Sequence, residues 1–208
     1  ANVNTFTPYP LYWLDPDGNS QFVGGGPVLK DWGDFSGFAT ASHVVVSNVY
    51  LGGGVDGEAD GGLSDTGATA DDASNTGMAD DEDGVTLPSS ALPGQTISIQ
   101  VNAHVAGRLN AWIDWNNNGT LATTERIAND QAVSAGVTTL SVTVPANAPV
   151  NANLGARFRF TSGAGQGTSP TGEAPNGEVE DYVLFVDGPD YDFGDLVDTG
   201  AGTGTGNY

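Results

Sequence analysis

The chain has 208 residues, enough to bury a core as one all-β domain with a long extension or as two small domains. Its 26 acidic and 5 basic residues give a formal net charge of −21, which disfavours nucleic acid and anionic membrane surfaces as partners. The 31 glycines, 11 prolines and single methionine argue against a helical fold. Cysteine is absent, which excludes disulfides and thiol chemistry. No apolar run reaches the roughly 18–20 residues of a membrane span, so we expect no membrane insertion.

The first segment, residues 1–30, is rich in aromatic residues and proline and differs in composition from the rest of the chain. We expect it to form an extended arm or an edge strand rather than a domain. Within it, residues 15–19 read Asp-Pro-Asp-Gly-Asn, which is typical of a turn. A second oxygen-rich metal loop is the alternative interpretation of these five residues.

Residues 31–87 contain neither lysine nor arginine. A strand is predicted at 43–51, and a tract rich in glycine and aspartate follows at 52–84. By composition the tract is typical of a disordered, solvated acidic loop. The alternative is that its clustered carboxylates bind further calcium ions, which would order a segment unable to bury a core by itself. The candidate ligands in this tract are Asp56, Asp60, Asp80, Asp81 and Asp83.

Residues 88–187 alternate between apolar and polar positions in several short runs, which is the pattern of half-buried strands. Turn sequences rich in proline and glycine separate the runs, and no helix is predicted. The spacing predicts an all-β fold, an antiparallel, jelly-roll-like β-sandwich with calcium-binding loops and extended terminal segments. The predicted strands lie at 97–105, 109–115, 139–144, 157–160 and 179–186.

One loop has the ligand spacing of a calcium site. Counted from Asp114 as position 1, Gly119 falls at position 6 and Glu125 at position 12, as in an EF-hand loop, although the sequence before it alternates like a strand. A plain hairpin turn at 118–119 is the alternative, but it does not require a glutamate at position 12. The predicted ligands are Asp114, Asn116, Asn118, the backbone carbonyl of Thr120, and Glu125. Because only two are charged, we expect weak affinity, on the order of 10⁻⁴–10⁻³ M, suited to extracellular calcium.

A family resemblance rests on several motifs that occur in a fixed order. The motifs are Asp31-Trp32-Gly33-Asp34, the acidic run 80–85, the run Ala-Trp-Ile-Asp-Trp-Asn at 111–116, Arg-Phe-Arg-Phe at 157–160, and the segment 172–182 with Gly-Glu-Val-Glu-Asp at 177–181. Over about residues 31–187 the chain resembles the GEVED domain of bacterial secreted or cell-surface, adhesin-like proteins. The resemblance implies a β-rich extracellular module, often repeated in tandem, without enzymatic activity. An echo of the first motif at 192–195 indicates that the C-terminal tail, 188–208, begins a truncated second repeat.

The carboxylates of Glu178, Glu180 and Asp181 stand at the start of the last predicted strand. Arg157 and Arg159 lie on a neighbouring predicted strand, so cross-strand pairing of arginine with carboxylate is the favoured role. Metal ligation is the second interpretation. A glycosidase-like pair of carboxylates is disfavoured, because nothing in the sequence indicates a sugar-binding cleft.

No catalytic motif is recognisable, and we expect no enzyme. His43 and His104 each stand alone, without the second histidine or cysteine of a zinc site. Trp112 lies on the strand face opposite Ile113 and is expected either to pack beneath a loop or to form an exposed contact.

We therefore expect a secreted or cell-surface structural or adhesive module that is stabilised by Ca²⁺. The terminal segments could join copies into a filament by strand donation, or they could cover the sheet edges of their own chain. The alternative function is a calcium-dependent carbohydrate-binding module in which exposed Trp13, Trp32 or Trp112 stacks on sugar rings. The expected partners are copies of the chain or neighbouring repeats, with glycans or other surface proteins as further candidates.

Overall fold

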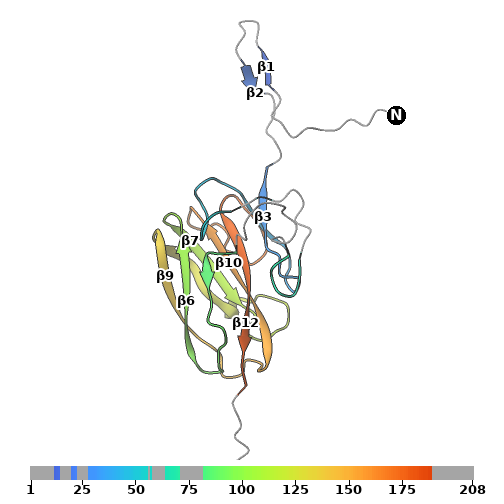
Figure 1. The fold of residues 1–208 in the computed structure, drawn as a ribbon, viewed down its shortest axis with the longest axis vertical. Coiled ribbons are helices and arrows are strands. Elements are labelled where there is room, and N and C mark those ends of the chain that lie inside the picture. The colour runs from blue at the N-terminus through green and yellow to red at the C-terminus, as the bar shows by residue number, and fades with distance from the viewer. Residues whose placement is uncertain are drawn as a thin grey trace, which may run out of the picture.

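The computed structural model describes residues 12–14, 20–22, 28–55, 57, 64–70 and 82–188, the first two segments as backbone alone. Within these residues the fold is all-β, as predicted (Figure 1). The described residues contain one helical element, the 3₁₀ turn Thr123–Glu125, and no helix that could span a membrane.

The centre of the fold is a β-sandwich of two antiparallel sheets. One sheet has the order β12-β10-β7-β8, and the other has the order β5-β6-β9. Together their inward side chains form one apolar core. The strands are β5 (Val85–Thr86), β6 (Thr96–Ala103), β7 (Gly107–Ile113), β8 (Arg126–Val133), β9 (Gly136–Thr143), β10 (Ala152–Thr161) and β12 (Glu178–Val186).

A third sheet covers the outer face of the four-stranded sheet. It has the order β11-β4-β3, from β3 (Lys30–Trp32), β4 (Ala41–Val44) and β11 (Gly172–Ala174), and β3 and β4 both contact β12. As a result, β10 is buried on both faces. Phe158 and Phe160 point into the sandwich core, whereas Arg157 and Arg159 point toward the third sheet.

One predicted strand needs correction, and one observed strand was missed. The strand predicted at 43–51 is wrong in extent: β4 ends at Val44, and the chain then turns at Asn48, whose φ is +71°. Leu51 forms only a single bridge, to Ala103. Strand β8 was not predicted, because its polar residues and shifted register hide the alternation that marks β6 and β9.

Near the N-terminus, β1 (Tyr12–Leu14) and β2 (Ser20–Phe22) form an antiparallel hairpin, and among the described strands they pair with each other alone. The turn predicted at 15–19 lies between these strands, but its own residues fall outside the described ones. The remainder of the arm up to residue 27, most of the acidic tract and the tail from residue 189 onward also lie outside the described residues.

Candidate metal centre

The loop at 114–125 connects β7 to β8 and is wrapped around the side chain of Asp114. The Asp114 carboxylate is only 2 % exposed and accepts backbone N–H groups from Asn118 at 3.1 Å and Gly119 at 2.7 Å. Asn117 and Gly119 have φ values of +54° and +76°, which let the backbone fold back toward this carboxylate. Twelve positions separate the strands here, so the alternative of a plain hairpin turn at 118–119 is wrong.

Glu125 closes the same loop from its other end. Its carboxylate is 3 % exposed and accepts N–H groups from Ala122 at 2.8 Å and Asn116 at 3.4 Å. Leu121 is buried between these positions and anchors the loop to the protein. Positions 1 and 12 of the predicted site are therefore both buried and both hydrogen-bonded to the backbone of one loop.

The two carboxylates lack a protein cation within the described part of the chain. The ion pairs found there join Lys30 to Glu173 and Arg157 to Asp181. Burial of a carboxylate without an opposite charge costs several kcal/mol, by order of magnitude. The loop therefore provides an environment that favours a cation.

The other donors of the loop are neutral oxygens. Asn116, Asn118 and Thr120 are exposed, and Asn118 Oδ1 accepts the N–H of Thr120 at 2.8 Å. No group of three or more His, Cys, Asp or Glu side chains is placed to hold a metal among the described residues. A site at this loop would consist of two carboxylates with amide and carbonyl oxygens, a set that suits a hard cation such as calcium and not zinc.

The second predicted group of ligands has one member among the described residues, Asp83. Asp83 is exposed, and its Oδ1 accepts the N–H of Gly53 at 2.7 Å, so it anchors one end of the acidic tract. The other four predicted ligands, Asp56, Asp60, Asp80 and Asp81, lie outside the described residues.

The segment 177–181 binds several distant parts of the chain. Glu178 Oε2 accepts the N–H of Leu51 at 2.5 Å, and Glu180 Oε1 accepts the N–H of Gly84 at 3.0 Å. These two glutamates point to the sandwich side of β12, away from the arginines, so the predicted pairing of Arg157 and Arg159 with Glu178 and Glu180 is wrong.

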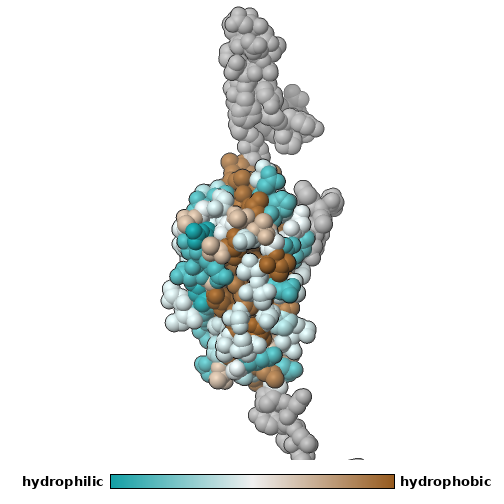
Figure 2. All heavy atoms as spheres, turned by 90° about the vertical axis from the view of Figure 1, so that its left-hand side faces the viewer, coloured by the Kyte–Doolittle hydropathy of each residue, from teal (hydrophilic) through white to brown (hydrophobic). Residues whose placement is uncertain are grey.

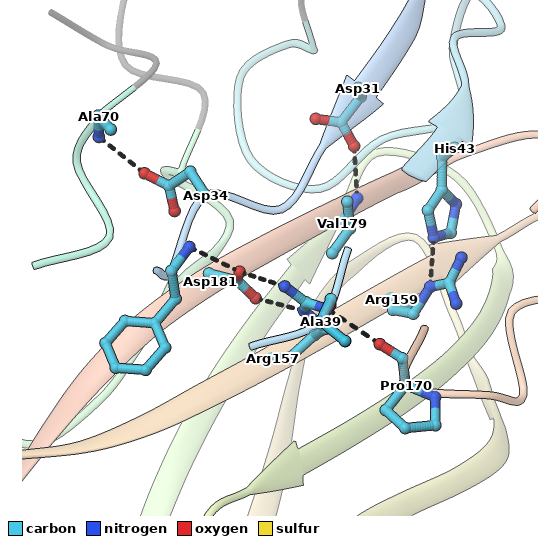
Figure 3. Close-up of polar contacts among 11 residues, drawn as sticks. Asp31, Asp34, Ala39, His43, Ala70, Arg157, Arg159, Pro170, Val179 and Asp181 are labelled. Carbon is cyan, nitrogen blue, oxygen red and sulfur yellow. Dashed lines mark hydrogen bonds and ion pairs between the residues drawn. The ribbon is translucent and has the colours of Figure 1, made fainter. Parts of the chain in front are cut away.

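Asp181, on the opposite face of β12, forms the predicted pair with Arg157 (Figure 3). Arg157 Nε and Nη2 donate to the two carboxylate oxygens, each at 2.7 Å. Arg157 Nη1 donates to the carbonyls of Ala39 and Pro170, and Phe35 N–H donates to Asp181. This buried pair joins the outer face of the sheet to the two loops above it.

Arg159 has different partners from those predicted. Its Nε donates to His43 Nε2 at 2.8 Å (Figure 3). Its other nitrogens donate to backbone carbonyls, including Gly172 at 2.8 Å. His43 Nδ1 therefore carries the ring proton and donates it to the Asn176 carbonyl at 2.8 Å. Burial, then the charge of Arg159, lowers the pKa of His43 well below its ordinary value. Burial and the nearby Arg157 lower the pKa of Arg159 to about 10, so it stays charged at neutral pH.

Trp112 has no exposed surface. The guanidinium of Arg126 lies 4.8 Å from the ring centroid, and this arginine also donates to the Thr168 carbonyl. The prediction of packing beneath a loop is confirmed, and that of an exposed contact is wrong. Trp112 is therefore not available to stack on a sugar ring.

Residues 108–185 match the family model of the GEVED domain. The matched region runs from β7 into β12 and contains both the loop at 114–125 and the segment 177–181. No curated protein and no solved structure matches the chain.

Proposed function

We propose that the chain is a calcium-stabilised, extracellular structural or adhesive module. The observation that carries the proposal is the buried pair of carboxylates, Asp114 and Glu125, in one loop without an ionic partner among the described residues. A divalent cation would compensate both charges at once, with Asn116, Asn118 and the Thr120 carbonyl as the neutral ligands.

The contribution of one such ion to stability is modest. An ion that binds only the folded loop adds RT ln(1 + [Ca²⁺]/Kd) to the free energy of unfolding, about 0.4–1.4 kcal/mol when the concentration is one to ten times Kd. Such an ion would order the loop and the end of β7 more than it would hold the sandwich together. The sandwich already has a continuous apolar core.

A structural role rather than catalysis is supported by the segment 177–181. Each of its carboxylates hydrogen-bonds to protein groups, Glu178 and Glu180 to backbone amides and Asp181 to Arg157. The net charge of −21 and the absence of cysteine agree with an extracellular module that is stabilised by a metal instead of disulfides.

Calcium titration of the Glu125→Gln variant tests the role of the loop. Glutamine keeps an acceptor for the Ala122 N–H but removes one charge, so we expect calcium affinity to fall by about tenfold or more, as for a lost charged ligand. The measurements are isothermal titration calorimetry and the shift in melting temperature between Ca²⁺ and EGTA.

Asp187→Asn is the matched control, because it removes one carboxylate charge at an exposed position outside the loop. This control should keep the calcium-dependent shift in melting temperature. An unmodified chain that melts identically in Ca²⁺ and EGTA, with no heat of calcium binding, would contradict the proposed role.

Assembly through the terminal segments is a further part of the proposed function. Deletion of residues 1–27 would remove all but the last three residues of the arm and retain β3, whose Asp31 accepts the Val179 N–H at 2.5 Å. If the arm donates a strand to a neighbouring copy, electron microscopy should show filaments for the full chain and none for the truncated one. Filaments of unchanged length after the deletion would exclude the arm as the connector.

A further inference from the structure

Strand β9 is an open edge of the sandwich. Over its whole length it pairs with β6 on one side, and no described strand pairs with its other side. In Figure 1 it lies at the left-hand margin of the molecule. An eight-residue edge of this kind presents a row of backbone donors and acceptors to another strand.

The residues that direct backbone groups outward can be identified from β6. Asn102, which lies opposite Val137, donates its N–H to Gly84 and accepts the N–H of Gly52, both on the side away from β9. In an antiparallel ladder such a pair exchanges no hydrogen bonds, so the backbone groups of Val137 point away from β6. The same alternation gives the full outward row, Val137, Thr139, Ser141 and Thr143.

The other long edges of the described sandwich are protected. Strand β8 carries Arg126, has Asp130 at a φ of +46°, and shifts register against β7, all features that hinder the addition of a strand. Strand β12 is partly covered by Ala91, which donates to the Phe185 carbonyl and accepts the Asp187 N–H. Strand β9 has no charged residue, no proline and no register shift.

The sheet that contains β9 also has no charged residue in its strands. None of the 26 acidic and 5 basic residues of the chain lies in β5, β6 or β9. Two copies that each carry a net charge of −21 repel each other in most relative orientations. At this sheet they would meet without like charges facing each other. Most exposed side chains of β6 and β9 are hydroxyls and amides, Thr96, Ser98, Gln100 and Asn102 on β6 and Thr139, Ser141 and Thr143 on β9.

Exposed apolar surface lies on the side of the molecule that carries β9. Figure 2 looks onto the side of the molecule that carries β9 and shows a hydrophobic band along its long axis. Val137 on β9 is 62 % exposed. Pairing along β9 would cover apolar surface as well as satisfy backbone groups.

We propose that β9 is a self-association edge that pairs antiparallel with β9 of a second copy about a two-fold axis. Pairing centred on Leu140 places Val137 opposite Thr143 and Thr139 opposite Ser141 of the second copy, and it continues the sheet as β5-β6-β9-β9-β6-β5. The symmetry closes the contact, so the product is a dimer and not a filament. The inference deepens the proposed structural role by naming a partner, and it does not depend on calcium.

Sedimentation velocity of the full chain over a range of concentrations tests the inference. Any filaments formed through the arm are first removed by centrifugation, and the unmodified protein that remains in solution should show a monomer–dimer equilibrium that strengthens as salt screens the net charge. Thr139→Pro removes an outward N–H that β6 does not use, so the monomer should fold normally. By symmetry the dimer loses this donor twice, so its dissociation constant should rise about tenfold or more.

Lysine substitutions provide a matched pair for the edge. Ser141→Lys places a charge on the edge, whereas Ser98→Lys places the same charge on the same exposed face, opposite Ser141 but in the interior of the sheet. We expect Ser141→Lys to be monomeric and Ser98→Lys to dimerise like the unmodified chain. An unmodified chain in solution that is monomeric at all concentrations, or equal effects of the two lysines, would each overturn the inference. A chain that binds calcium but stays monomeric would contradict only this inference.

Discussion

Gly177 occupies a position that a residue with a side chain cannot take without strain. Its φ is +100°, and a Cβ atom there would lie 1.9 Å from the carbonyl oxygen of Phe160. This close approach lets β12 start beside the end of β10, in register with it. The alternation that follows sends Glu178 and Glu180 to the sandwich side and Asp181 to the side of the third sheet, so a short segment holds both layers together.

Gly177→Ala should therefore destabilise the protein more than a positive φ alone explains. Gly172 is the matched control, because its φ is +81° but a Cβ atom added there would meet nothing within 4 Å. We expect Gly172→Ala to cost about 1–2 kcal/mol from backbone strain. Gly177→Ala should cost at least about 3 kcal/mol because of the additional collision. Urea unfolding of both variants measures the difference, and equal losses would show that the Phe160 contact is unimportant.

Elements with regular alternation were predictable from sequence, and those that depend on distant contacts were not. Strands β6, β9 and β12 lie close to their predicted positions, because each has one apolar face against the core. Strand β8 was missed because Asp130 takes a positive φ and interrupts the pattern. Strand β11 has only three residues and pairs with β4, which lies more than a hundred residues earlier in the chain.

The same distinction applies to the candidate site. The spacing of acidic and amide residues at 114–125 is local, so sequence alone located a loop whose two carboxylates are buried together. The contact of His43 with Arg159 joins β4 to β10 and could not be found from spacing. A signal was nevertheless present, since His43 stands beside an apolar run in a predicted strand, a position where a histidine needs buried partners.

On the scale of the whole molecule, the third sheet is attached to the sandwich through polar and charged groups instead of a second apolar core. Arg157 and Arg159 are fully or almost fully buried between the layers and are satisfied by carbonyls, one carboxylate and one imidazole. Such an interface depends on the protonation state of its members, because an unmatched charge between the layers is costly. His43 is the member whose ordinary pKa lies nearest neutral pH, and burial beside Arg159 lowers this pKa in the folded chain.

The free energy of unfolding should fall as the pH is lowered through about 6.5, the ordinary pKa of histidine. The folded chain keeps His43 neutral because burial and Arg159 lower its pKa, whereas the unfolded chain takes up a proton below about 6.5. This uptake reduces stability by up to about 1.4 kcal/mol per pH unit until the folded pKa is reached. Urea unfolding between about pH 5 and 7, above the range of most carboxylates, measures this slope.

His43→Gln removes the titrating group and should flatten the slope that this residue contributes, whatever its effect on absolute stability. His104→Gln is the matched control, since His104 is exposed and stacks on Tyr50 at the surface. That variant should keep the slope of the unmodified chain. If His43→Gln and the unmodified chain lose stability in parallel on acidification, then the junction between the third sheet and the sandwich is not the pH-sensitive part of this fold.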